Sequence, residues 1–331
     1  MQLPHLGFVR RCGVWLPCLV WLSLVLAGSF TFANPQSGAA QPAFRVTLLG
    51  TGYPEPRMDR FGPSILVQAG DSYFLFDCGR GATQRLAQIK APPAGVNALF
   101  LTHLHSDHTV GIPDLWLTGW VQGRNVPLRV WGPSGTKSMM THLQEAYAFD
   151  VHIRRDVDER LPAQGVEVVA QDIGEGVVYQ SGGVKITAFS VDHGPVKPAL
   201  GYRVDFAGHS IVLSGDTRPS DNLVRFAQGA DVLIHEVMDT DAFRSANTFT
   251  EERVQRVAAH HTTPEAAGRI FSRVKPRLAV YSHIVPGSAP NLVPATRKTY
   301  SGPLEVGEDL MTIGIGGKID VHRPPGGANA L

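Results

Sequence analysis

Cysteine is scarce in this sequence, and neither charge sign dominates it. Cys12, Cys18 and Cys78 are the only cysteines among 331 residues, so a framework of several disulfides is excluded. The 30 Lys and Arg side chains and 29 Asp and Glu side chains give a formal charge of +1, which shows no overall basic footprint for nucleic acid or acidic membranes. Hydrophobic residues make up 43% of the chain, enough to bury a large core.

The first 33 residues have the layout of a secretory signal peptide. Arg10 and Arg11 precede an apolar run over residues 12–28, and small residues follow up to Ala33, where we expect cleavage. A cleaved chain would be periplasmic or secreted, would keep Cys78 as its one thiol, and would have no stable membrane association. The alternative is a retained membrane anchor, because about 17 apolar residues nearly span a bilayer.

The remaining residues predict one α/β domain. Residues 34–43 are rich in small and polar residues and are expected to form a flexible lead-in to a single domain over residues 44–331. Alternating or continuous apolar runs predict strands, and apolar residues at helical spacing predict helices between and after them. The predicted strands are 44–49, 64–68, 73–77, 98–102, 128–131, 166–170, 177–180, 184–191, 200–206, 210–214, 231–235 and 277–282; the predicted helices are 82–89, 113–122, 135–147, 251–259 and 264–274.

The strongest chemical signal is the run His103-x-His105-x-Asp107-His108, directly after an apolar strand. Three imidazoles and a carboxylate within six residues cannot all be neighbours on a helix. On a loop leaving a strand they can point in different directions around two ions. Neutral imidazole and carboxylate are the ligands that zinc and its first-row neighbours prefer, so the run predicts a metal site.

Five further motifs occur in an order that resembles the metallo-β-lactamase superfamily, and within it the tRNA 3′-processing endonucleases, their exported relatives and the arylsulfatases of that fold. The resemblance extends from about Val46 to His283. It implies a four-layer αββα sandwich, with two mixed sheets flanked by helices. The motifs are Val46–Gly52, Phe76–Gly81, Asp192–Gly194 with Gly201–Val204, Ser214–Pro219, and Tyr281–Ile284.

The resemblance also implies a set of seven metal ligands. His103, His105 and His193 would hold one ion; Asp107, His108 and His283 would hold the second. Asp216 would bridge them, and a hydroxide shared by the two ions would attack the substrate, with Asp107 in the catalytic machinery. The expected ions are two Zn²⁺, with Mn²⁺ or iron as alternatives.

Other polar residues near these motifs have less specific patterns. His261 is the expected proton donor to the leaving group, with His260 as the alternative, and either could instead be an ordinary residue at the start of a helix. Asp77 and Glu236 end apolar strands and are expected to orient ligating histidines, or else to play a capping role.

The substrate prediction depends on two features of the chain. Asp216 argues against a β-lactam, because lactamases of this superfamily generally lack that residue. Only nine residues separate Val204 from Ser214, a tight hairpin around Gly208, where many tRNA-processing enzymes insert a long arm. With the neutral charge and the export signal, this favours an exported hydrolase of a small anionic ester, either a phosphodiester or an aryl sulfate, and argues against nucleic acid as a partner.

Several alternatives stay open at this point. A lactone, thiolester or β-lactam hydrolase would share the fold, as would a cytoplasmic tRNA 3′-processing endonuclease whose apolar start is misinterpreted. A non-enzymatic metal-binding protein would be expected to have lost ligands, whereas all seven are present. The sequence leaves the oligomeric state open, with a homodimer as one alternative.

Export is tested on the protein purified from its own cells. N-terminal sequencing should find a mature chain that begins near Asn34, in the periplasmic or secreted fraction. A chain that keeps residues 1–33 in the cytoplasmic fraction would show that the apolar run is not a signal peptide.

Overall fold

The computed structural model describes residues 44–246, 248–287 and 290–324. The predicted signal peptide and the lead-in over residues 34–43 lie outside these ranges. In the part of the chain that is described, no helix has both the length and the apolar character needed to cross a membrane.

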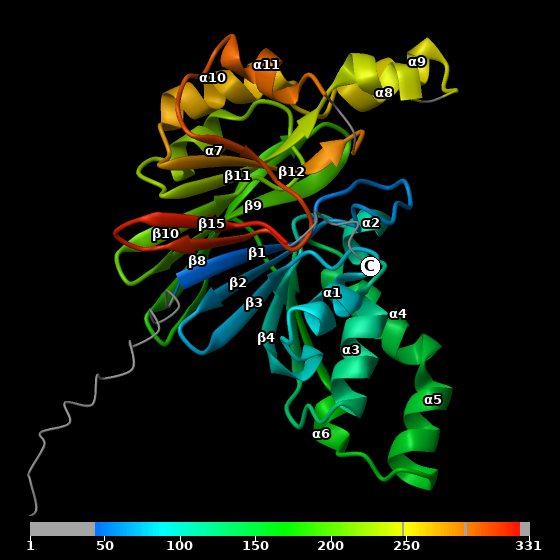
Figure 1. The fold of residues 1–331 in the computed structure, drawn as a ribbon. Coiled ribbons are helices and arrows are strands. Elements are labelled where there is room, and N and C mark those ends of the chain that lie inside the picture. Colours follow the sequence, from blue (N-terminus) through cyan, green and yellow to red (C-terminus); the bar gives the residue numbers. More distant parts are fainter. Residues whose placement is uncertain (1–43, 247, 288–289, 325–331) are drawn as a thin grey trace, which may run out of the picture. The chain divides into compact units, whose positions relative to one another are not determined.

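The first sheet has eight strands in the order β15-β14-β1-β2-β3-β4-β5-β6 (Figure 1). Its β1, β2 and β3 pair antiparallel, whereas β3 to β6 pair parallel, so the sheet is mixed. The strands are β1 (Phe44–Gly50), β2 (Ser64–Ala69), β3 (Ser72–Phe76), β4 (Val96–Phe100), β5 (Leu128–Gly132), β6 (Val168–Asp172), β14 (Thr312–Ile315) and β15 (Ile319–His322).

The second sheet has seven strands in the order β13-β12-β11-β10-β9-β8-β7. It is also mixed, because β10 to β13 pair parallel and the other neighbours pair antiparallel. The strands are β7 (Gly176–Ser181), β8 (Val184–His193), β9 (Val196–Phe206), β10 (His209–Leu213), β11 (Val232–Met238), β12 (Leu278–Val285) and β13 (Leu304–Val306).

Helices cover the outer face of each sheet, which confirms the predicted αββα sandwich (Figure 1). On the first sheet lie α1 (Ala82–Gln88), α3 (Ile112–Val121) and α4 (Thr136–Ala146); on the second lie α7 (Asp221–Phe226), α10 (Pro264–Val274) and α11 (Leu292–Arg297). The remaining helical segments are η1 (Pro93–Gly95), α2 (Ser106–Thr109), α5 (Ala148–His152), η2 (Ile153–Val157), α6 (Ala163–Val166), α8 (Thr240–Ala246) and α9 (Glu251–Ala258).

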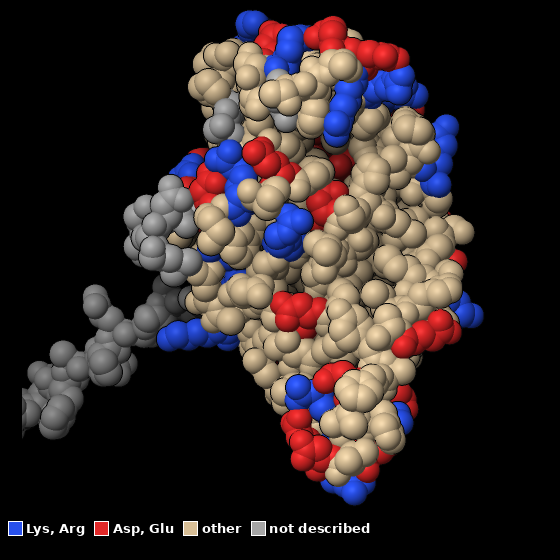
Figure 2. Space-filling model, turned by 90° about the vertical axis from the view of Figure 1, so that its right-hand side faces the viewer, with Lys and Arg blue, Asp and Glu red and all other residues tan. Residues whose placement is uncertain are grey.

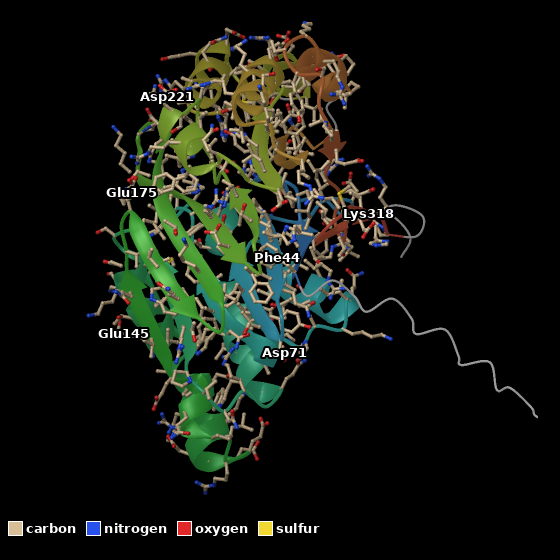
Figure 3. All side chains as sticks on the ribbon, turned by 90° about the vertical axis from the view of Figure 1, so that its left-hand side faces the viewer. Phe44, Asp71, Glu145, Glu175, Asp221 and Lys318 are labelled. Atoms are coloured by element: carbon tan, nitrogen blue, oxygen red, sulfur yellow. The ribbon has the colours of Figure 1, made fainter. Side chains whose placement is uncertain are left out.

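The largest core cluster fills the space between the two sheets. Phe44, at the start of β1 (Figure 3), is buried there, and the rings of Phe76 and Phe100 stack with their centroids 5.2 Å apart. Alternate residues of each strand point to this layer, while the others pack against the helices, as expected for strands that are covered on both faces. Burial on both faces explains why several strands are continuous apolar runs.

The structure contains several elements that we did not predict, among them α7, α8, α11 and β13. Two further differences concern the first sheet. The strand predicted over residues 166–170 begins at Val168, because residues 163–166 form the short helix α6. The C-terminal hairpin β14–β15, which we did not predict, returns to the first sheet beside β1. The predicted tight hairpin between β9 and β10 is confirmed, with Ala207 and Gly208 both at positive φ, the turn that matches strand twist.

A buried ion pair fixes the first sheet to the segment that precedes β14. Arg85 of α1 and Asp309 are 1% and 0% exposed and lie 3.0 Å apart. Asp309 also accepts hydrogen bonds from the backbone N–H groups of Thr51 and Phe61. These contacts hold the loop after β1, which leads toward the edge where the polar motifs lie.

Replacement of Asp309 should destabilise the fold strongly. Asp309→Ala leaves the Arg85 guanidinium buried without its carboxylate, which costs about 3–5 kcal/mol. Asp221→Ala is the control, because Asp221 and its partner Arg273 are 88% and 55% exposed, and such a surface pair contributes at most about 1 kcal/mol. Urea unfolding measures both variants, and equal losses would contradict the structural role of the buried pair.

Candidate metal centre and adjoining cavity

The histidine-rich run lies at the carboxyl end of β4, where the chain leaves the first sheet. His103 lies outside helices and strands and His105 is in extended backbone, whereas Asp107 and His108 lie on one helical turn, α2. The prediction of a simple loop was therefore incomplete, since half of the motif is helical. Because the backbone becomes helical within the run, its side chains approach one point from different directions. His103, Asp107 and His108 are buried, and His105 is exposed.

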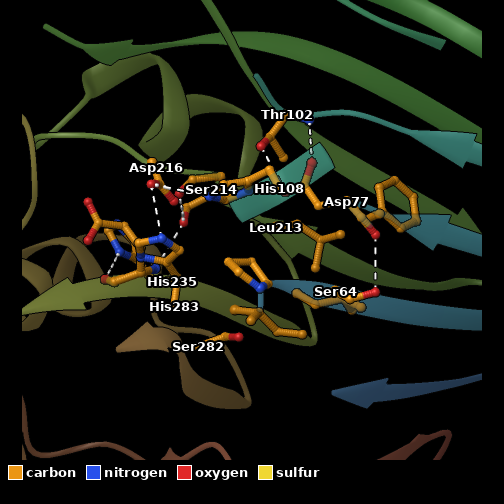
Figure 4. Close-up of a pocket in the computed structure, with 16 residues that line it drawn as sticks. Ser64, Asp77, Thr102, His108, Leu213, Ser214, Asp216, His235, Ser282 and His283 are labelled. Carbon is orange, nitrogen blue, oxygen red and sulfur yellow. Dashed lines mark hydrogen bonds and ion pairs between the residues drawn. The ribbon is translucent and has the colours of Figure 1, made fainter. Parts of the chain in front are cut away.

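The three distant predicted ligands come from the second sheet. His193 ends β8, Asp216 follows β10, and His283 lies within β12. They lie close to the histidine-rich run because the strand ends that carry these polar residues, in both sheets, are at the same edge of the sandwich. The distances from Asp216 Oδ2 are 3.2 Å to His283 Nε2 and 3.5 Å to His108 Nε2 (Figure 4). The Nε2 atoms of His103 and His193 each lie 3.9 Å from the same oxygen.

All seven predicted ligands belong to groups whose ligand atoms lie within 4.8 Å of one another. Asp216 lies centrally among four of the imidazoles. The groups relevant to the prediction are His103 with His105 and His193, Asp107 with His108 and His283, and Asp216 with His103 and His108.

The donor atoms of this cluster are suited to metal ions. The Nε2 atoms of His103, His108 and His193 are buried and have no hydrogen-bond partner, as does Oδ1 of Asp216. Buried polar atoms are normally paired, so four such atoms at one point are typical of a site that binds a cation. Imidazole nitrogen and carboxylate oxygen are the donors that zinc and related divalent ions prefer, so the residues fit a two-metal site.

The other ring nitrogen of three of these histidines is held by a neighbour. His108 Nδ1 lies 2.8 Å from Asp77 Oδ2, His103 Nδ1 lies 3.0 Å from Thr102 Oγ1, and His193 Nδ1 lies 3.0 Å from the carbonyl oxygen of His260. Such contacts fix the ring and leave Nε2 directed at the centre of the cluster. The predicted contact of Asp77 with a histidine of the cluster is thus present.

Asp77 is held in an unusual backbone conformation. Its φ of 57° lies in the left-handed region, which residues other than glycine rarely adopt, and Thr102 donates both its N–H and its hydroxyl to the Asp77 carboxylate. The next residues pack against the histidine-rich run: Cys78 N–H donates to the carbonyl oxygen of His108, and a Cβ at Gly79 would lie 2.5 Å from the carbonyl oxygen of Asp107. Only glycine permits this approach, so the glycine turn positions the metal-site segment.

The pKa shifts show how charge is balanced in the cluster. Burial lowers the pKa of His103 well below its ordinary value and that of His193 to about 4. Burial also opposes a charge on His108, but the carboxylates of Asp216 and Asp77 outweigh it and hold the pKa of His108 well above its ordinary value. Despite burial, neighbouring histidines hold the pKa of Asp216 well below its usual range. Asp216 is therefore an anion that needs protons or metal ions beside it.

Glu236, at 2% exposed, does not contact a predicted ligand, contrary to our expectation. It accepts hydrogen bonds from the backbone N–H groups of Thr217 and Thr262, and its Oε1 lies 3.2 Å from His261 Nδ1. The ring of His261 lies parallel to that of His283, with centroids 5.7 Å apart. Glu236 therefore supports His261, the residue expected to donate a proton, while His260 also faces the same region.

A cavity of about 470 Å³ lies directly beside the cluster. Its polar side includes His105, Asp107, Asp216, His260, His261 and His283; its other side includes Tyr53, Phe243, Phe249, Arg253 and Val257. We did not predict the second group, because α8 was not predicted and because Phe249, Arg253 and Val257 form no distinctive pattern in the sequence. On the face of the molecule in Figure 2, basic and acidic residues are interspersed among uncharged ones.

Comparisons with known proteins agree with this fold and site. The model of the beta-lactamase superfamily domain matches residues 72–284. Ribonuclease Z of Mycobacterium marinum is 37% identical over 279 residues, which cover 82% of this chain and 98% of that protein. Ribonuclease Z of Mycobacterium bovis is 36% identical over 281 residues, with the same coverage of each chain.

Two solved structures resemble the fold at low sequence identity. The metallo-beta-lactamase fold protein YhfI from Bacillus subtilis has a TM-score of 0.62 and 21% identity, over 81% of this chain and 98% of that one. The short form of human tRNase Z has the same TM-score and identity, over 82% of this chain and 99% of that one. At these identities the likeness shows the fold alone.

The relatives contradict our substrate prediction, which took a small phosphodiester or aryl sulfate as the substrate and argued against nucleic acid. The absence of the arm does not exclude a ribonuclease, because the Mycobacterium marinum protein, which aligns over 98% of its length with 82% of this chain, is named ribonuclease Z. The argument from net charge fails because a total over the whole chain does not describe the charge around one cavity.

Loss of the Asp77 carboxylate should weaken metal binding. Asp77→Ala removes the partner of His108 Nδ1, and loss of such a partner lowers metal affinity about 10- to 100-fold. Competition with a chelator measures the zinc affinity. Asp231→Ala is a matched control, because Asp231 Oδ2 lies 3.2 Å from His209 Nδ1 in another part of the second sheet. Unchanged affinity in Asp77→Ala, or an equal loss in the control, would contradict this role.

Proposed function

This chain belongs to the ribonuclease Z family of the beta-lactamase superfamily, and from that premise we propose that it is a metal-dependent endonuclease that cleaves RNA precursors such as tRNA with a 3′ extension. The observation that carries the proposal is the convergence of seven imidazole and carboxylate ligands beside an open cavity. Such a site serves hydrolysis of a phosphodiester, and the most similar relatives cited above are named for ribonuclease activity.

We propose the seven predicted residues as the ligands of two divalent ions. His103, His105 and His193 would hold one ion, Asp107, His108 and His283 the other, and Asp216 both. When bound, the ions lower the pKa of water and stabilise negative charge on the phosphoryl group. Zinc suits this donor set best, and manganese or iron can use the same donors.

The oxygen that leaves phosphorus has to be protonated, and a residue of the chain has to deliver that proton. Hydrolysis forms a bond between a water oxygen and phosphorus, and it breaks the bond from phosphorus to the leaving sugar oxygen, which then takes a proton. His261 lines the cavity, is 9% exposed, and has Glu236 against its Nδ1. Burial lowers the pKa of His261 to about 4, and burial together with the Asp216 carboxylate raises the pKa of Glu236 well above its ordinary value. We propose that His261 delivers the proton to the leaving oxygen and that Glu236, against its Nδ1, positions the ring.

Export is a separate proposal that concerns residues 1–33, outside the described ranges. If the chain is exported, it meets RNA in the periplasm or the medium, and the precursor tested below represents the chemistry of its substrate. The cluster and the cavity are formed by residues after Phe44, so the proposed reaction does not depend on the location.

The endonuclease proposal is tested on purified zinc-loaded protein with a tRNA precursor that carries a 3′ extension. We expect one endonucleolytic cut near the end of the acceptor stem, which Asp216→Ala abolishes. An intact precursor with the wild-type protein, or cleavage that survives Asp216→Ala, would contradict the proposal.

The proton-donor role is tested by comparing leaving groups. His261→Ala should lower kcat on the RNA by about 10²- to 10⁴-fold, because a sugar alkoxide needs a proton. The same variant should change hydrolysis of bis(p-nitrophenyl) phosphate little, because nitrophenolate leaves as a stable anion. His260→Ala is the control at the neighbouring position. Equal losses on both substrates, or a larger effect of His260→Ala on the RNA, would assign the proton to another group.

A further inference from the structure

The wall of the cavity away from the metal cluster is largely aromatic and apolar. It comes from three parts of the chain: the loop after β1, the segment from α8 to α9, and the end of β12. Its members are Tyr53, Pro54, Phe243, Phe249, Val257 and Val285, with Glu55 and Arg253 as the charged residues.

This wall is rigid on its buried side. Tyr53, Phe243, Val254 and Val285 are at most 6% exposed and form one cluster with Met238 at the end of β11. Phe249 packs against that cluster while remaining partly exposed, and its ring centroid lies 5.8 Å from that of Phe243. The Phe249 ring is thus held by the core on one side and borders the cavity on the other.

Arg253 differs from the neighbouring arginines of this segment. Arg244 pairs with Glu251, and Arg256 pairs with Glu252. The Arg253 guanidinium instead lies 3.6 Å from the centroid of the Phe249 ring, and among the described residues no ion pair includes it. A guanidinium over a ring keeps its N–H donors free at its edge, so it can bind an anion while it stacks.

We propose that this wall is a nucleotide subsite that holds one base of the RNA next to the scissile phosphate. The base packs among the rings of Phe249, Phe243 and Tyr53, and Arg253 binds the adjoining phosphate. This inference rests on the proposed endonuclease function, since the base belongs to its RNA substrate.

Three properties of the wall support a base as the occupant. Aromatic side chains bind unpaired bases by stacking, because every base has a π-face. A cavity of about 470 Å³ is within the range that encloses a small ligand, and it continues to Asp107 and His261 at the reacting phosphate. The positive charge of Arg253 matches a phosphodiester backbone, whereas a purely apolar ligand would leave that charge without a partner.

The subsite is tested by the binding of two probes to zinc-loaded protein, measured by calorimetry. Adenosine 5′-monophosphate and ribose 5-phosphate carry the same phosphate and sugar, so the ratio of their affinities isolates the base. We expect the adenosine nucleotide to bind at least about tenfold more tightly, in line with the usual strength of base–aromatic stacking. Phe249→Ala should remove that preference, and Arg253→Ala should weaken both probes.

Arg225→Ala is the matched control, because Arg225 also lies over a phenylalanine ring, that of Phe226 on α7, at 4.8 Å from its centroid. It is absent from the cavity wall, so this variant should bind both probes as the wild type does. Equal affinity of the two probes in the wild type, or a preference that survives in Phe249→Ala, would overturn the subsite. Phe249→Tyr keeps the ring and should keep the preference, which separates stacking from misfolding.

The experiments can disprove the nucleotide subsite and the endonuclease function independently of each other. A protein that cuts the precursor but shows no preference for the base disproves the subsite alone. A protein that prefers the base through Phe249 but leaves the precursor intact disproves the endonuclease proposal and assigns the subsite to another nucleotide ester.

Discussion

A carboxylate removed from water is stable only beside positive charge, and Asp216 is in that position. It is 3% exposed, and four imidazoles lie within 3.9 Å of its Oδ2. These histidines come from the segment after β4, from β8 and β12, and from the turn α2, so residues from both sheets surround this one carboxylate. The sandwich brings the polar ends of the two sheets together, and the metal ions that we propose to balance Asp216 would also serve hydrolysis.

The supporting residues show how the fold maintains this arrangement. Three features outside the ligand set hold parts of the cluster in place: Asp77 at positive φ, Gly79 against the histidine-rich run, and the carbonyl oxygen of His260. The buried ion pair of Arg85 and Asp309 holds the loop after β1. That loop also supplies Tyr53 to the cavity, so one buried ion pair serves both the stability of the sheet and the shape of the cavity.

Much of this could be predicted from sequence, because metal ligands leave a pattern of residue types that follow apolar strands. All seven ligand positions, from His103 to His283, converge as expected, and Asp77 contacts a histidine of the cluster. Glu236 was assigned the wrong partner because residue type alone does not tell which histidine a carboxylate faces. The cavity wall was missed because Phe249 and Arg253 are ordinary residues in sequence, and only folding places them beside Asp107. The substrate prediction was wrong because it depended on the net charge of the whole chain and on the absence of a long arm. Neither feature describes the cavity beside the predicted metal ligands.

The central claim is that Asp216 lies between two metal ions. Crystals grown with zinc and measured at wavelengths on either side of the zinc absorption edge test it most directly. The account predicts two anomalous peaks, one between His103, His105 and His193 and one between Asp107, His108 and His283, with the Asp216 carboxylate contacting both. A single peak, or peaks that leave Asp216 without a metal contact, would contradict it.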